Sequence, residues 1–240
     1  MTVTIEVTCR YCDQAEPVRK HGTGKAGFPR YYCKDCQRTF QLNYRYNGHK
    51  PGMKEKIVDM AMNGSGVRDT GRVLGLGINT VMRTFKKLSP KQVTSRQIAY
   101  DDVTLICELD EQGSFVGNKK QRHWLWYAFD TKRKQVIAHV FGPRTDATCR
   151  KLLNLLASFN IRFITTDNWG SYAREMVPEK HLVGKIFTQR IERHNLNLRI
   201  HIKRLARRTI CYSRSMEIHE KLIGAYIEKH HYNSFGVMTK

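Results

Sequence analysis

The chain has 240 residues and is strongly basic, with 42 Lys and Arg against 21 Asp and Glu and a net charge of +21. No run of about 18 apolar residues and no basic-then-apolar leader occurs, which argues against a membrane-spanning or secreted protein and favours the cytoplasm. The excess of positive charge is shared by both halves of the chain. Nucleic acid is therefore the expected partner, and a merely basic protein is the alternative.

Four of the seven cysteines form two Cys-x2-Cys pairs near the N-terminus. Paired thiolates at this spacing are typical of a structural zinc site. A redox Cys-x-x-Cys motif or a disulfide framework would use the same residue type, but redox motifs do not usually occur doubled in this way. We expect a small zinc ribbon over residues 1–46, with short strands near 3–7, 30–32 and 39–42. Its single Zn²⁺ would be held by Cys9, Cys12, Cys33 and Cys36.

Residues 47–52 have the composition of a linker, and helical spacing of apolar residues begins at residue 53. It predicts helices near 53–62, 67–74 and 78–88, with a glycine turn at 75–77 before the third. This is the arrangement of a helix-turn-helix domain (53–88), whose last helix enters the major groove of double-stranded DNA. A plain three-helix bundle is the alternative. The expected contacts are Asn79, Thr80 and Arg83 to base edges and Lys86 and Lys87 to phosphates.

Residues 89–102 are polar and are expected to connect the helices to an α/β region. Three strands near 103–110, 123–130 and 135–141 are joined by short turns, which predicts an antiparallel meander. A helix (146–158), a strand (161–166), a short helix (172–176), a short strand (181–184) and two closing helices (188–206 and 215–231) follow. This order predicts a ribonuclease H-like domain with a mixed sheet over residues 103–240. The whole chain is thus expected to be multidomain.

Acidic residues are scarce, so their positions are informative. Asp110 and Asp167 each end an apolar strand, and Glu192 lies early in a helix crowded with Arg, His and Lys. Three carboxylates brought together would repel one another, and two divalent metal ions would relieve that repulsion. Such a pair of Mg²⁺ (or Mn²⁺) ions suits phosphodiester cleavage. Surface acids that balance basic neighbours are the alternative, and Glu108 is the substitute ligand if Asp110 is not one.

Three segments resemble the catalytic segments of the insertion-sequence-one transposases. They are Glu-Leu-Asp-Glu-Gln at 108–112, Thr-Asp-Asn-Trp at 166–169 and Thr-Gln-Arg-Ile-Glu-Arg-His-Asn-Leu-Asn-Leu-Arg at 188–199. The resemblance extends over essentially the whole chain. It implies a ribonuclease H-like catalytic domain of the DDE type, preceded by a zinc finger and a helix-turn-helix that bind the terminal inverted repeats of the mobile element.

The resemblance assigns roles to individual residues. Asp110, Asp167 and Glu192 become the metal-binding triad. Arg199, seven residues after Glu192 and on the same helix face, matches a residue that holds DNA phosphate. Further candidates are His194 and Asn195, which would support metal or DNA, and Trp169, which would either stack on a base or pack in the core. Gly113 and Ser114 depart from the family pattern, because an aromatic residue is expected there.

The sequence as a whole therefore predicts a DNA transposase that cleaves and joins DNA strands in a metal-dependent reaction. Because two element ends must be joined, a homodimer or higher assembly on DNA is expected. Two alternatives stay open. A DNA-binding repressor without catalysis would need only residues 1 to about 90, and a structure-selective nuclease of the same fold would cut branched DNA without regard to end sequence.

Overall fold

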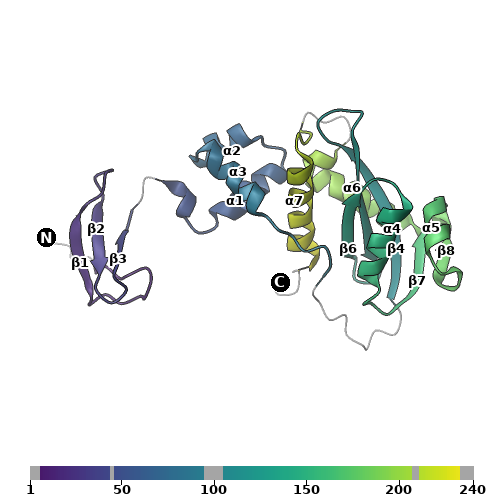
Figure 1. Cartoon of the computed structure of the whole chain (residues 1–240), viewed down its shortest axis with the longest axis horizontal. Coiled ribbons are helices and arrows are strands. Elements are labelled where there is room, and N and C mark those ends of the chain that lie inside the picture. The colour runs from purple at the N-terminus through teal and green to yellow at the C-terminus, as the bar shows by residue number, and fades with distance from the viewer. Residues whose placement is uncertain (1–5, 44–45, 95–104, 207–210, 233–240) are drawn as a thin grey trace. The chain divides into compact units, whose positions relative to one another are not determined.

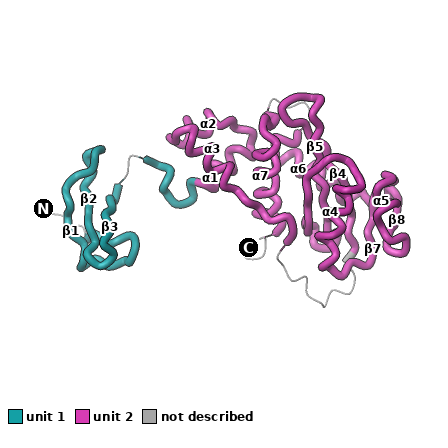
Figure 2. Tube along the Cα trace, viewed as in Figure 1, with its two compact units in different colours: residues 1–53 teal, residues 54–240 magenta. Residues whose placement is uncertain are grey.

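The computed structural model describes residues 6–43, 46–94, 105–206 and 211–232 (Figure 1). The chain divides into two compact units, residues 1–53 and 54–240 (Figure 2). Most of the strand expected near 3–7 and most of the connector 89–102 lie outside the described residues. Among the residues that are described, no helix combines the length and apolar character that a membrane span requires.

The N-terminal unit contains an antiparallel sheet in the order β1-β2-β3. Its strands are β1 (Val18–Thr23), β2 (Pro29–Cys33) and β3 (Arg38–Gln41). The last two agree with the expected strands, whereas β1 was not predicted because its side chains are polar and mostly exposed. Cys9, Cys33 and Phe40 form the small buried centre of this unit. So small a core does not hold a fold of this size by itself.

The second unit begins with three helices at the predicted positions, α1 (Met53–Met62), α2 (Val67–Leu74) and α3 (Ile78–Lys87). Gly75 ends α2 in the left-handed conformation, with φ of 64°. At Gly71 the chain folds back so closely that a Cβ atom would lie 2.8 Å from the Leu76 carbonyl oxygen. The tight turn between α2 and α3 therefore depends on glycine at both positions.

A five-stranded sheet with the order β6-β5-β4-β7-β8 forms the centre of this unit. β4, β5 and β6 are antiparallel, whereas β7 and β8 run parallel to β4. The expected mixed sheet is thus confirmed. The elements are β4 (Leu105–Phe115), β5 (Arg122–Asp130), β6 (Gln135–Gly142), α4 (Asp146–Leu156), β7 (Ile161–Thr166), α5 (Gly170–Glu175), β8 (His181–Val183), α6 (Gln189–His201) and α7 (Met216–Ile227). Short 3-10 turns lie at Asn47–His49, Pro178–Lys180, Lys185–Phe187 and Lys203–Leu205, and a π turn at Glu228–Tyr232.

Helices cover both faces of the sheet, with α4 and α5 on one side and α6 and α7 on the other (Figure 1). Side chains alternate along β4 accordingly. Cys107 and Leu109 are fully buried in the core that α4 shares with the sheet. Glu108 and Asp110, on the opposite face, contact α6. The helices α1 to α3 belong to the same compact unit as this sheet, and the finer domain boundaries at 53–88, 89–102 and 103–240 stay a prediction.

β4 is longer than expected and continues to Phe115 instead of ending at Asp110. The physical reason is its pairing with β5, which extends to Phe115 opposite Arg122. Pairing with β7 ends earlier, at Glu108 opposite Thr165. Asp110 therefore lies in the part of β4 that is paired on one side only. Its other side is open at the C-terminal end of β7.

Candidate functional site

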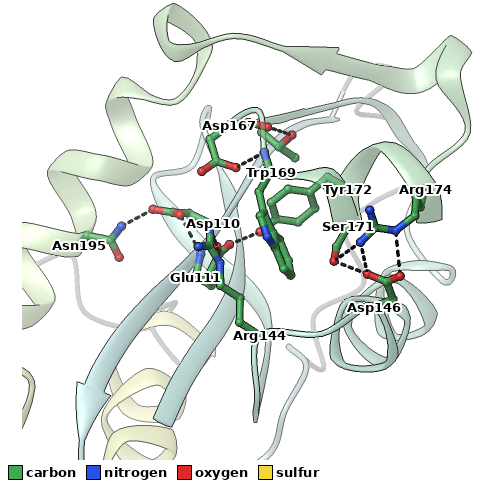
Figure 3. Close-up of polar contacts among 11 residues, drawn as sticks. Asp110, Glu111, Arg144, Asp146, Asp167, Trp169, Ser171, Tyr172, Arg174 and Asn195 are labelled. Atoms are coloured by element: carbon green, nitrogen blue, oxygen red, sulfur yellow. Dashed lines mark hydrogen bonds and ion pairs between the residues drawn. The ribbon is translucent and has the colours of Figure 1, made fainter. Parts of the chain in front are cut away.

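The parallel register of β4 and β7 brings Asp110 and Asp167 together. Glu108 lies opposite Thr165, so two residues later Asp110 meets Asp167 at the point where β7 ends. Carboxylate oxygens of Asp110, Glu111 and Asp167 lie within 4.8 Å of one another (Figure 3). The backbone N–H of Trp169 donates to Asp167 Oδ1 at 3.1 Å and fixes that carboxylate. Two residues of the predicted triad are thus adjacent, and Glu111 is a third carboxylate beside them.

Helix α6 presents Glu192 and Asn195 on the side that faces Asp110. The Asn195 amide nitrogen donates to Asp110 Oδ2 at 2.5 Å (Figure 3). Glu192 lies in the first turn of α6, three residues before Asn195 and so on the same helix face. It is exposed and is not one of the three carboxylates within 4.8 Å. Its charge nevertheless acts on Asp110, whose pKa it helps to raise.

The surroundings of Asp110 disfavour its ionised form. Burial raises its pKa to about 6, and the negative charges of Asp167 and Glu192 act in the same direction. Hydrogen bonds from the Glu111 backbone N–H and from Asn195 oppose this shift by stabilising the ionised form. A divalent cation among these carboxylates would stabilise all of the ionised forms. The donor set therefore fits a hard metal ion such as Mg²⁺.

Asn195 is itself held in place by a buried tyrosine. The hydroxyl of Tyr127 donates its one proton to Asn195 Oδ1 at 3.0 Å, and the Ile191 carbonyl oxygen lies 3.3 Å from the same hydroxyl. Burial raises the pKa of Tyr127 well above its ordinary value, so the hydroxyl keeps its proton and acts as a donor. With its oxygen facing Tyr127, the Asn195 side chain must present its NH₂ group to Asp110. Sequence reasoning missed Tyr127, although it lies directly opposite Asp110 in the β4–β5 register.

Glu108 caps the helix that carries Glu192. Its buried carboxylate accepts a hydrogen bond from the backbone N–H of Ile191, in the first turn of α6, at 2.6 Å. This N–H has no partner within the helix, so Glu108 supplies the capping acceptor from a neighbouring strand. Burial raises the pKa of Glu108, and the hydrogen bond opposes that shift. Glu108, which the sequence offered as a substitute metal ligand, thus anchors α6 to β4.

A second set of polar side chains surrounds Glu111 on the opposite face of β4. The Tyr172 hydroxyl donates to Glu111 Oε2 at 2.7 Å, and Arg144 Nε donates to Oε1 at 2.5 Å (Figure 3). Burial raises the pKa of Glu111 to about 7. The Arg144 guanidinium also lies over the Trp169 ring, 4.5 Å from its centroid. Glu111, Arg144 and Tyr172 were not singled out from the sequence, because nothing local to each residue indicates that they meet.

The remaining predicted residues of this region lie around α6 and the core. Trp169 packs on Trp126, with ring centroids 5.1 Å apart. The His194 ring is buried against Phe129 at 4.6 Å, and burial lowers the pKa of His194 to about 4. Arg199 lies one turn after Asn195, and its positive charge opposes the rise in the pKa of Tyr127 that burial causes. Roles for His194 and Arg199 in binding metal or DNA stay predictions.

The four predicted zinc ligands converge in the N-terminal unit. Their sulfur atoms lie within 4.8 Å of one another, and those of Cys12 and Cys33 are 3.8 Å apart. Tetrahedral zinc–thiolate bonds of about 2.3 Å separate neighbouring sulfurs by about 3.8 Å. The residue after each Cys-x2-Cys pair, Asp13 or Gln37, has positive φ, so the two pairs form matching turns. This donor set and geometry fit a structural zinc ion.

The predicted DNA-contacting residues share one face of α3. Asn79, Arg83, Lys86 and Lys87 are exposed and Thr80 is half-buried, whereas Val81 and Phe85 on the other face are buried. The N-terminus of this helix follows the glycine turn directly. The face that the sequence assigned to DNA is therefore the accessible one.

Comparisons with known proteins agree with this architecture. The family model described as IS1 transposase matches residues 104–233, and the model described as InsA C-terminal domain matches residues 44–89. These two matches, to a helical part and then to a carboxylate-bearing part, identify a DNA-binding transposase with a helix-turn-helix. The chain belongs to the IS1 transposase family.

Curated relatives are similar to this chain over more than half of its length. The insertion element iso-IS1n protein InsB of Shigella dysenteriae is 68% identical over 128 residues, which are 53% of this chain and 98% of that protein. The insertion element IS1 1 protein InsB of Escherichia coli (strain K12) is 47% identical over 149 residues, 62% of this chain and 89% of that protein. The family assignment therefore rests on nearly the full length of these relatives.

Two solved structures are more distant. A cryoEM structure of the simian T-cell lymphotropic virus intasome in complex with PP2A regulatory subunit B56 gamma has a TM-score of 0.40 at 13% identity, over 75% of this chain and 70% of that one. The catalytic core domain of BIV integrase has a TM-score of 0.36 at 14% identity, over 56% of this chain and 88% of that one. Scores this low do not establish a common fold.

Proposed function

We propose that this chain is a DDE transposase that binds the terminal inverted repeats of its element and cleaves and joins DNA strands. The observation that carries the proposal is the meeting of Asp110 with Asp167 at the end of the β4–β7 pair, with Glu192 presented from α6. The strand order and directions of the sheet also support a ribonuclease H-like catalytic domain. In this fold the carboxylates gather where β7 ends.

Asp110, Asp167 and Glu192 would hold two Mg²⁺ (or Mn²⁺) ions. Bound there, the ions supply an activated nucleophile and stabilise the leaving oxygen. The chain's own contribution is to fix the ligands. Asn195 holds Asp110 in one orientation, and the Trp169 backbone N–H does the same for Asp167. Arg199, on the same helix, is proposed to hold a DNA phosphate.

Two successive reactions at one site account for cleavage and joining. In the first, a water oxygen attacks the phosphorus at the element end, and the 3′ oxygen leaves as a hydroxyl. In the second, that 3′-hydroxyl attacks a phosphodiester of target DNA, whose own 3′ oxygen leaves. In each step an O–H oxygen attacks and releases its proton to solvent, and the departing 3′ oxygen takes up one, so the same carboxylates serve both steps.

Recognition of the element ends is assigned to the N-terminal part of the chain. The zinc-binding unit and α3 would contact double-stranded DNA, with Asn79, Thr80 and Arg83 at base edges and Lys86 and Lys87 at phosphates. Because two ends must be joined, we infer a homodimer or higher assembly on DNA in the bacterial cytoplasm. Phosphate contacts of this kind make binding strongly dependent on salt.

The test compares the wild type with Asp110→Asn and Glu192→Gln. A labelled duplex carrying the element end is incubated with Mg²⁺, and both binding and strand cleavage are followed. Glu217→Gln is the matched control, since Glu217 also lies in the first turn of a helix, α7, and is exposed. We expect the two active-site variants to bind like the wild type and to lose at least about 100-fold in cleavage, because each removes a metal-binding charge.

The control variant should cleave normally. If the wild type binds the end but none of the proteins cleaves, the chain acts as a DNA-binding repressor. If all cleave branched DNA equally well without the end sequence, it is a structure-selective nuclease. Cleavage that survives in Glu192→Gln would remove Glu192 from the triad.

A further inference from the structure

Five side chains form a row of alternating rings and guanidinium groups that ends at the carboxylate site. We call this row the aromatic–arginine ladder. Arg122 lies 5.7 Å from the Phe115 ring centroid and 5.9 Å from that of Trp124. Arg144 lies 5.4 Å from the Trp124 centroid and 4.5 Å from that of Trp169. The members are therefore Phe115, Arg122, Trp124, Arg144 and Trp169.

The ladder follows one face of the sheet beyond the part that α4 covers. Phe115 pairs with Arg122 at the turn end of the β4–β5 hairpin, and Trp124 is on the same face of β5. Further along that face, Trp126 is fully buried in the core with α4. Phe115 is 42% exposed, Arg122 and Arg144 are exposed, and Trp124 is half-buried. The surface of the ladder is therefore accessible from the hairpin turn to the edge of the core.

The last member of the ladder is joined to a candidate catalytic carboxylate. The backbone N–H of Trp169 donates to Asp167 Oδ1 at 3.1 Å. Arg144, the member before it, binds Glu111, whose carboxylate lies within 4.8 Å of Asp110 and Asp167. A ligand that lies along the ladder thus reaches the carboxylates at one end.

Gly113 makes room for the ladder. It pairs with Trp124 across the two strands, and a Cβ atom at residue 113 would lie 2.9 Å from the Trp124 ring. The indole ring therefore lies against the bare backbone of the neighbouring strand. This explains the departure from the family pattern noted at this position, because an aromatic side chain there would occupy the space that Trp124 fills.

We propose that the aromatic–arginine ladder binds single-stranded DNA next to the phosphodiester that is cleaved. Unpaired bases stack on the outer surfaces of the ladder, which are the exposed Phe115 ring and the guanidinium planes that lie over the other rings, and the guanidinium N–H groups contact the phosphates between them. Lys119 and Lys120, exposed in the hairpin turn, add positive charge at the far end. A duplex cannot use the ring faces, because its bases are stacked on one another. This inference rests on the proposed function, since it requires that the carboxylates act on DNA.

Tryptophan fluorescence tests the proposal locally. The three tryptophans of the chain are Trp124, Trp126 and Trp169, and neither α3 nor the zinc-binding unit contains one, so their emission reports on the region of the ladder. The full chain with its zinc is titrated in buffer without Mg²⁺ or Mn²⁺, using an oligothymidylate of about 16 nucleotides, a length within the range of known single-strand sites. We expect quenching by the single strand and much weaker quenching by a duplex of the same length.

Two variants and one control separate stacking from charge. Trp124→Phe should lose most of the quenching and bind the single strand about tenfold more weakly, because the smaller ring supports the two guanidinium groups less well. Arg122→Gln should reduce the slope of log affinity against log salt by about 0.7, the value for one phosphate on a single strand. The control is Arg162→Gln, which removes an arginine that lies 5.5 Å from the Phe163 ring outside the ladder. It should change neither quantity.

The outcomes distinguish this proposal from the proposed function. Absence of quenching in a wild type that cleaves end-containing duplex overturns the ladder and leaves the transposase assignment intact. Equal quenching by single strand and duplex, or equal losses in Arg122→Gln and Arg162→Gln, also overturns it. The expected pattern in a protein that cleaves nothing supports the ladder as a single-strand site and removes the catalytic assignment.

Discussion

The orientation of one amide decides how Asp110 is presented. The oxygen and nitrogen ends of the Asn195 side chain are not interchangeable, because a carboxylate accepts a hydrogen bond from NH₂ and is repelled by a carbonyl oxygen. Tyr127 donates to the Asn195 oxygen, and the nitrogen donates to Asp110. Loss of such a second partner of a metal ligand typically lowers metal affinity or activity by about 10- to 100-fold.

Tyr127→Phe removes the donor without changing the shape of the side chain. The Asn195 oxygen then has no fixed partner at Tyr127, and the amide can turn its oxygen toward Asp110. We expect the Mn²⁺ concentration for half-maximal cleavage to rise about 10-fold, within the range for such partners, while binding to element-end DNA is unchanged. The measurement is the metal dependence of cleavage at fixed pH and ionic strength.

Tyr232→Phe is the matched control for this prediction. Tyr232 is buried, and its hydroxyl is hydrogen-bonded to His139 and to the Gln92 carbonyl oxygen. Its loss should not change the metal dependence. Equal shifts in both variants would mean that a general loss of packing, and not the orientation of Asn195, sets the metal affinity.

Sequence patterns predicted some of these residues and missed others for a physical reason. Asp110 and Asp167 are acidic residues in or directly after apolar strands, a local signal that can be read along the chain. The contacts of Tyr127, Glu111 and Arg144 depend on strand register and on the placement of loops, which no local pattern contains. The Cys-x2-Cys pairs were predictable because their spacing itself describes the turns that aim the sulfurs.

Helix α6 is positioned by an acceptor outside the helix. Glu108 on β4 accepts from the Ile191 backbone N–H, and Gln112 on the same face donates to the Asn195 carbonyl oxygen at 3.2 Å. β4 therefore contacts α6 at two successive turns. Glu192 directly follows the first attachment and Asn195 carries the second, so the distances of both residues from Asp110 depend on these attachments.

Glu108→Ala should lower the free energy of unfolding by about 1–2 kcal/mol, the usual cost of a lost N-terminal helix cap. Glu108→Gln keeps an oxygen at the same position and should cost less than half of that. Urea unfolding followed by tryptophan emission is the appropriate measurement, because all three tryptophans lie in this unit. Equal losses in the two variants would show that the charge of Glu108, and not its acceptor geometry, holds the helix.

Helices were easier to predict from the sequence than strands. The period of apolar residues placed α1, α2 and α3 almost to the residue. β1 carries polar side chains on both faces, so alternation gave no signal, and it forms because β2 pairs with it. The length of β4 was underestimated because Glu111, Gln112 and Gly113 interrupt the apolar pattern, although β5 pairs with all three.

The two units of the chain depend on different sources of stability. Residues 54–240 bury an extensive apolar core on both sides of the five-stranded sheet. The N-terminal unit buries little beyond Cys9, Cys33 and Phe40. A structural zinc ion in such a unit contributes about 10–16 kcal/mol, more than the stability of an ordinary small domain. We therefore expect the metal to decide whether this unit is folded.

Removal of zinc should affect the stability of the two units differently. A strong chelator should unfold residues 6–43, seen as loss of hydrogen-exchange protection at the β2 amides, while the tryptophan emission of residues 54–240 stays unchanged. Cys36→Ser should abolish the single bound zinc, whereas Cys149→Ser, in α4, should keep it. Affinity for element-end DNA should fall with the zinc if this unit contributes to recognition. Protection of the β2 amides that survives chelation would mean that the four thiols fold the unit without metal.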